Sequence, residues 1–141
     1  MGQWGVRSYE NDEADSALDS GFDRVHGPVY EDLMDDGNPM TVEQIQRKLA
    51  DDRTLAAAVE AIRSEVGRPW ADWDDEERLG LAGVVVRHAE LGVPIPPEWR
   101  EIAVEWLRDE TMEWEESTAR DLRRRKEIEL LSARSGGGET A

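Results

Sequence analysis

Residues 74–91, with the sequence DDEERLGLAGVVVRHAEL, decide the fold class. Asp74 followed three residues later by Glu77 is the pattern of a capping box, so a helix should begin here and run to Leu91. Apolar residues at helical spacing form two stripes along it, with Leu79, Ala82, Val86 and Ala89 in one and Leu81, Val84, Val85, His88 and Leu91 in the other. A helix that is apolar most of the way round is typical of the centre of a domain. We therefore predict a central helix, in which Gly80 and Gly83 would let a neighbouring helix approach closely.

The segment before this central helix begins with a second clear helix signal. Asn11 is a good N-cap, and the apolar residues after it recur every three or four positions, at Ala14, Leu18, Phe22 and Val25. Gly27-Pro28 interrupts this pattern, and proline suits the first turn of the helical piece that continues to Leu33. We therefore predict a helix from Asn11 that is broken at Gly27.

Capping signals and amphipathic spacing predict further helices. They cover about 42–50, about 53–66, Pro97 to at least Leu107, and about 115–133. Gly-rich residues follow the last of these helices. We therefore predict an all-α fold, a single compact domain of about six helices over residues 1–134, with a disordered C-terminal tail at 135–141.

Composition narrows the possible functions. The 141 residues carry 33 Asp and Glu against 17 Lys and Arg, a formal net charge of −16, which argues against unaided binding to nucleic acid or an anionic membrane. The absence of Cys excludes disulfides, thiolate metal sites and a Cys nucleophile. No apolar run is long enough to span a bilayer and no secretory signal opens the chain, so we expect a cytoplasmic protein. No cofactor-binding motif occurs, and we expect no cofactor and no metal centre.

The opening residues resemble a known family. The chain begins Met-Gly-Gln-Trp-Gly, and Tyr9-Glu-Asn-Asp-Glu-Ala14 follows closely. This is similar to an uncharacterised family of small bacterial proteins, defined as a domain of unknown function, that opens with Met-Gly-x-Trp-Gly, then an aromatic residue, then Asn-Asp and an Ala-containing helix. The match covers about 15 of the 141 residues, and Arg7-Ser8-Tyr9 departs from the Gly-Pro-Phe-like stretch expected there. The resemblance implies a compact single domain and supplies no activity.

Two interpretations fit this opening segment. In the first, Trp4 and Tyr9 plug the core and Asn11 caps the following helix. In the second, the segment forms a binding pocket beside Trp4 that is lined by Arg7, Glu10, Asn11 and Asp12.

Acidic residues recur along one side of the first helix. They are Asp12, Asp15, Asp19 and Asp23, followed by His26. Spacings of three and four place these carboxylates opposite Ala14, Leu18 and Phe22, so we expect them to be exposed. Together with Glu31, Asp32, Asp35 and Asp36 they could instead hold a divalent cation through oxygen ligands. A solvated face is the simpler interpretation of such a run.

The remaining polar signals lie in the second half of the chain. His88 falls on the apolar face of the central helix, which favours a hydrogen-bonded core histidine, although Arg87 and Glu90 nearby leave an acid–base role open. One basic cluster occurs in the last helix, at Arg120, Arg123, Arg124, Arg125 and Lys126. We expect this helix to pack across the acidic body through exposed ion pairs; contact with nucleic acid or an acidic partner is the alternative.

The sequence predicts a small acidic, non-enzymatic binding or regulatory protein, immunity-like or an adaptor, for a basic partner protein. The candidate binding residues are Trp4, Arg7, Tyr9, Glu10, Asn11, Asp12, Asp15, Asp19 and Asp23. The alternative is a carboxylate-based enzyme, with or without a divalent metal, because carboxylate sites leave no fixed spacing in a sequence.

Overall fold

The computed structural model describes residues 5–35, 37–111, 114 and 116–140, and it describes side chains as far as Ser132. In this part of the chain the protein is all-α, a single domain of seven helices and one short 3-10 helix with no strand, so the predicted fold class is confirmed. The helices are α1 (Asp12–His26), α2 (Pro28–Leu33), α3 (Val42–Leu49), α4 (Asp52–Val66), α5 (Asp75–Glu90), α6 (Pro97–Arg108) and α7 (Ser117–Thr140), and the 3-10 helix covers Trp70–Asp72.

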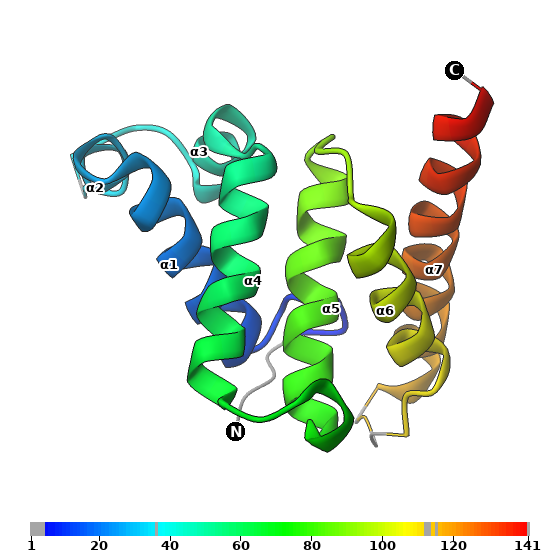
Figure 1. Ribbon diagram of the computed structural model, residues 1–141. Coiled ribbons are helices and arrows are strands. Elements are labelled where there is room, and N and C mark those ends of the chain that lie inside the picture. The colour runs from blue at the N-terminus through cyan, green and yellow to red at the C-terminus, as the bar shows by residue number, and fades with distance from the viewer. Residues whose placement is uncertain (1–4, 36, 112–113, 115, 141) are drawn as a thin grey trace.

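Helix α5 lies in the middle of the fold, between α1 and α4 on one side and α6 and α7 on the other (Figure 1). Every residue from Leu79 to Ala89 is buried. Since a fully buried Val or Leu side chain contributes ~1.5–3 kcal/mol, this helix supplies a large share of the apolar stabilisation. The predicted central position of the 74–91 segment is confirmed.

Local signals begin α1, α3 and α5 and end α4 where the sequence predicts. The Ala14 N–H donates to Asn11 Oδ1 at 2.9 Å, so Asn11 caps α1. Thr41 and Asp74 each form a complete capping box at the start of α3 and α5. Helix α4 ends at Gly67, whose φ of 68° lies in the left-handed region that glycine enters without strain.

Two glycines allow α1 to pack closely against its neighbours. A Cβ on Gly21 would lie 2.8 Å from the Ala58 nitrogen, so α1 meets the backbone of α4 at this point. A Cβ on Gly80 of α5 would lie 2.7 Å from Glu13 Cβ, so α1 also approaches α5 closely. The close helix contact predicted for Gly80 is confirmed, whereas no pattern in the sequence indicates the one at Gly21.

Gly83 serves a different purpose from the predicted one. Its nearest neighbours are the backbone atoms of Ser8 and Tyr9, which belong to the irregular segment before α1. A side chain at position 83 would collide with that backbone. The prediction of a neighbouring helix at Gly83 is therefore wrong, because the close neighbour is the irregular backbone of Ser8 and Tyr9.

Three Trp side chains pack together where the connection between α4 and α5 meets α6. The ring centres of Trp70 and Trp73 lie 4.6 Å apart, and each lies 5.6 Å from the ring centre of Trp106. Aromatic pairs at such distances add ~0.5–1.5 kcal/mol beyond the area that they bury. This cluster closes one end of the core.

The last helix runs further than the sequence suggests. Helix α7 extends from Ser117 to Thr140, and no side chain after Ser132 is described, so the disorder expected at 135–141 stays a prediction. Among the described helices, none combines the length and the apolar content needed to cross a membrane.

Candidate functional site

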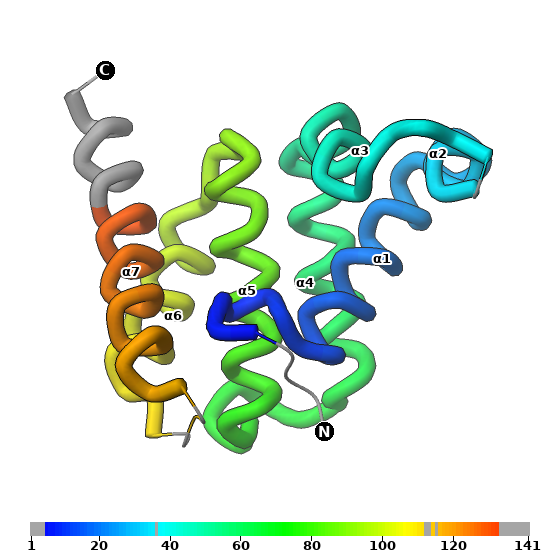
Figure 2. Tube along the Cα trace, turned by 180° about the vertical axis from the view of Figure 1, so that it is seen from behind, coloured from blue at the N-terminus to red at the C-terminus, as the bar shows by residue number. Residues whose placement is uncertain are grey.

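Residues 5–11 form an irregular segment that lies across α5 between α1 and α7 (Figure 2). We call this segment the N-terminal strap. Ser8 is fully buried, and its backbone N–H and hydroxyl donate to Glu127 Oε2 of α7 at 2.9 and 3.1 Å. Arg120 of α7 donates from Nη1 to the Val6 carbonyl at 2.8 Å. Helix α7 therefore holds the strap through charged side chains.

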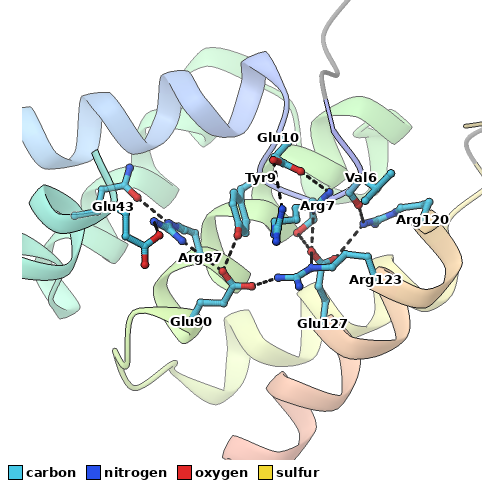
Figure 3. Close-up of polar contacts among 12 residues, drawn as sticks. Val6, Arg7, Tyr9, Glu10, Glu43, Arg87, Glu90, Arg120, Arg123 and Glu127 are labelled. Carbon is cyan, nitrogen blue, oxygen red and sulfur yellow. Dashed lines mark hydrogen bonds and ion pairs between the residues drawn. The ribbon is translucent and has the colours of Figure 1, made fainter. Parts of the chain in front are cut away.

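A row of alternating charges runs beside the strap from α3 through α5 to α7, and Figure 3 shows it from Glu43 to Arg120. The row ends at Glu110, in the connection between α6 and α7. We call it the charge network, and its members in order are Glu43, Arg87, Glu90, Arg123, Glu127, Arg120 and Glu110. Each charge inside the row lies between groups of opposite sign, so the attraction links elements that are far apart in sequence. This network fixes the position of α7.

Tyr9 connects the strap to the charge network (Figure 3). Its hydroxyl donates to Glu90 Oε1 at 2.7 Å, and the Arg87 guanidinium lies 5.2 Å from the centre of its ring. Burial, and then the hydrogen bond to Glu90, raise the pKa of Tyr9 to about 12. The phenol therefore stays protonated at neutral pH and acts as a donor. The ring also packs against the core, as the first interpretation of the opening segment expects.

Arg120 and Glu127 form the buried centre of the charge network. Each side chain is only 1% exposed, and Arg120 Nη1 lies 3.1 Å from Glu127 Oε1. Burial raises the pKa of Glu127, against the opposing influence of Arg120 and the Ser8 donors. The expectation that the basic cluster of the last helix makes exposed pairs is wrong at Arg120, because a run of arginines does not reveal which of them turns inward.

His88 is a core histidine. Its ring is fully buried, with Nδ1 lying 3.0 Å from the Val84 carbonyl and Nε2 lying 2.9 Å from Thr54 Oγ1. Phe22 stacks on the ring with the two centres 5.9 Å apart. Burial lowers the pKa of His88 to about 4, so the ring is neutral at pH 7. The predicted core role is confirmed, and both ring nitrogens are engaged inside the protein.

The acidic residues of α1 form an exposed stripe. Its members are Asp12, Asp15, Asp19 and Asp23, as predicted. Within the described residues, none of the four forms an ion pair. Asp19 Oδ1 accepts a hydrogen bond of 2.6 Å from the Tyr30 hydroxyl, which holds α2 against the stripe. Partial burial, and then Asp19 and Asp12, raise the pKa of Asp15, so the carboxylates repel one another.

The structure separates the other candidate binding residues. Arg7 and Glu10 lie together on the strap, with Arg7 Nη1 3.7 Å from Glu10 Oε2. Asn11 faces inward, where it caps α1 and donates to the Ser8 carbonyl. Trp4 lies outside the described residues, so its role stays a prediction.

The cation-binding alternative gains no support from the geometry. His26 turns away from the stripe, and its Nε2 lies 2.8 Å from the Leu49 carbonyl, which ties α1 to α3. In the described part of the chain, no group of three or more His, Asp and Glu side chains is arranged to hold a metal ion. Asp36, one of the candidate ligands, lies outside the described residues.

A groove between α1 and α4 adjoins the stripe and was not predicted. Its volume is about 550 Å³, and Asp12 of the stripe belongs to its rim. Ser16, Ser20 and Ser64 also line it. No sequence motif marks serines inside helices as part of a groove. The groove also depends on how closely α1 approaches α4, and the spacing of residues along the sequence does not reveal that distance.

Comparison with protein-family models, with curated proteins and with solved structures gave no match. The family resemblance of the opening residues therefore stays a prediction, and the function is argued from the side chains alone.

Proposed function

We propose that this chain is a small acidic, non-enzymatic binding protein, immunity-like or an adaptor, that captures a basic partner protein through α1 and α2. The supporting observation is the exposed stripe of α1, whose carboxylates have no described basic partner. A protein that keeps like charges side by side loses stability by doing so, since each i,i+4 pair costs ~0.2–0.5 kcal/mol. A basic partner would remove that repulsion.

The charge around the stripe is strongly one-sided. Residues 12–35 contain eight Asp and Glu against one basic residue, Arg24, which is a net charge of −7 with His26 neutral. A concentrated charge of this kind accelerates encounter with an oppositely charged protein and makes association sensitive to salt. By contrast, α6 carries three Glu and two Arg, so its charges nearly balance.

The alternative, a carboxylate-based enzyme with or without a divalent metal, has no comparable support. The most buried carboxylate of the charge network, Glu127, is occupied by Ser8 and Arg120. The buried imidazole of His88 is bonded to Thr54 and Val84. These groups stabilise the fold and are not presented to a substrate.

The proposal is tested with two charge-matched variants. The stripe variant carries Asp15→Asn, Asp19→Asn and Asp23→Asn. The control variant carries three exposed Glu→Gln changes on α6, at Glu98, Glu101 and Glu105. Partners are captured from a host lysate at low salt, and association with each recovered protein is measured by surface plasmon resonance over a salt series.

We expect the stripe variant to slow association with the partner and to flatten its salt dependence, while dissociation changes little. The α6 variant should behave like the unmodified protein. Equal losses in both variants would show that only net charge matters, and unchanged kinetics in the stripe variant would contradict the proposal.

A further inference from the structure

The groove between α1 and α4 has the size of a ligand site. Its volume of about 550 Å³ lies within the ~300–1,000 Å³ that such sites occupy. Its lining residues come from α1, α4 and, at Glu77, the start of α5, and no member of the charge network is among them. Short side chains leave this space, namely Ser16 and Ser20 of α1 and Ala61 and Ser64 of α4.

The floor of the groove is apolar. Ala17 and Ile62 lie at its base and are buried, and the half-buried Val66 continues the surface toward the end of α4. These side chains leave no ionisable group at the bottom. A hydrocarbon chain can therefore rest there without covering a polar side chain that needs water.

The rim of the groove is acidic. Four carboxylates line it, from Asp12, Glu13, Glu65 and Glu77, against a single described basic residue, Arg24. Arg68 pairs with Glu77 and neutralises that carboxylate. The other three keep a net negative charge beside an apolar floor.

Glu13 lies among several other carboxylates on this rim. Partial burial raises the pKa of its carboxyl, and the nearby charges of Glu76, Asp12 and Asp74 raise it further. The first turns of α1 and α5 meet here, and each carries a run of acidic residues. A cation entering the groove would offset this repulsion.

We propose that this groove seats a basic segment of the partner protein, with Lys or Arg stems on the apolar floor and their charged ends at Glu13 and Glu65. This inference rests on the proposed function and adds the position and the chemistry of the contact. Lys and Arg suit the groove because each joins a hydrocarbon stem to a charged end. A compact metal ion would use the carboxylates without using the floor.

The first test is an NMR titration of the ¹⁵N-labelled full chain with a defined probe. The probe is a blocked nonapeptide that alternates Lys and Leu, and the same peptide with Glu in place of Lys is the charge control. We expect the amide signals of Ser16, Ser20, Ala61 and Ser64 to shift with the Lys peptide only. The titration is performed at constant ionic strength, because salt alone screens exposed carboxylates.

The second test isolates the contribution of the apolar floor. A third nonapeptide replaces each Lys by 2,3-diaminopropionate, which has the same charge on a much shorter stem. If the stems rest on Ala17 and Ile62, this peptide should bind about tenfold more weakly, a difference of ~1.4 kcal/mol. Equal affinity of the two basic peptides would overturn the seating of stems on the floor.

The third test fills the groove without changing its charge. Ala61→Phe places a bulky side chain among the lining residues, and Ala56→Phe places the same side chain on the exposed face of the same helix. Binding of the Lys peptide should fall about tenfold in Ala61→Phe and stay within about twofold in Ala56→Phe. Circular dichroism confirms that each variant is folded, and Ala61→Leu provides a smaller filling side chain, with the charge unchanged, if Ala61→Phe does not fold.

The outcomes separate this inference from the proposed function. If the Lys peptide shifts the amides of Asp15, Asp19 and Asp23 and ignores the groove, the groove assignment fails while the acidic stripe remains the contact. If the Lys and Glu peptides cause the same small shifts, neither surface selects a basic segment, and both proposals fail.

Discussion

Glu127 accepts two hydrogen bonds from Ser8, a residue 119 positions earlier in the chain, through the backbone N–H and the hydroxyl of that serine. Both residues are buried, and Arg120 completes the site from the other carboxylate oxygen. The Glu127 carboxylate thus joins the strap to the last helix, beside the bond from Arg120 to the Val6 carbonyl.

Glu127→Gln should lower the free energy of unfolding by about 3 kcal/mol, since removing one member of a buried ion pair leaves the other charge poorly compensated. Arg120 keeps its bond to Glu110, which places the loss at the lower end of the range for buried pairs. Urea unfolding measures the change. Glu129→Gln, an exposed change on the same helix, should alter stability by less than ~0.5 kcal/mol. Similar effects of the two changes would contradict a buried role for Glu127.

Gly83→Ala should displace the strap. Alanine favours a helix over glycine by up to ~1 kcal/mol, but a Cβ at this position collides with the Ser8 backbone, and overpacking of this kind costs ~1–3 kcal/mol. We expect net destabilisation and faster hydrogen exchange at the Ser8 amide, with α4 amides unchanged. A variant that is more stable and keeps the Ser8 amide protected from exchange would contradict this prediction, because the Ser8 backbone would then accommodate the added methyl group.

His88 should make stability depend on pH between about 4 and 6.5. Burial lowers the folded-state pKa to about 4, so as the pH falls below 6.5 the unfolded chain takes up a proton before the folded protein does. The contribution of His88 to the free energy of unfolding is therefore complete above pH 6.5 and falls by about 3 kcal/mol as the pH approaches 4. Urea unfolding across this range should show a slope that His88→Gln removes. The same slope in both proteins would assign it to other groups.

Neutralising the acidic stripe should leave the fold intact. Asp15→Asn, Asp19→Asn and Asp23→Asn remove two repulsive i,i+4 pairs worth ~0.2–0.5 kcal/mol each, while the loss of Asp15 from the first turn of α1 costs ~0.3 kcal/mol or more. The amide oxygen introduced by Asp19→Asn would still accept the hydrogen bond from Tyr30. We expect a change below ~1 kcal/mol and a smaller rise of Tm with NaCl than in the unmodified protein. Unfolding of the variant would show instead that the stripe is structural.

The sequence predicts the structural features that depend on residues close together in the chain, namely helix caps and helix faces. The two apolar stripes of residues 74–91 identified α5 as central, and the caps at Asn11, Thr41 and Asp74 are interactions over three residues. The exposure of the α1 stripe follows from helical spacing alone. The core role of His88 followed from the apolar face on which it lies.

The sequence does not predict contacts that tertiary packing creates. Arg120 belongs to a basic run that looks solvated, and only the approach of α7 to the strap turns it inward. Gly83 looks like a site of helix contact, because the backbone that fills it lies 75 positions earlier in the chain. The groove lies between short side chains of α1 and α4, and no motif marks where two helices leave such a space.

The bond between Ser8 and Glu127 also has a consequence for biosynthesis. Because a ribosome makes the chain from its N-terminus, Ser8 is available long before Glu127 emerges. Helices α1, α4 and α5 can therefore pack together while the strap still lacks its bonds to α7. Closing a loop of this length is slow compared with forming helices. The strap should therefore be the last part of the nascent protein to settle, and a chain stalled before α7 would leave Gly83 uncovered for a chaperone or a protease to reach.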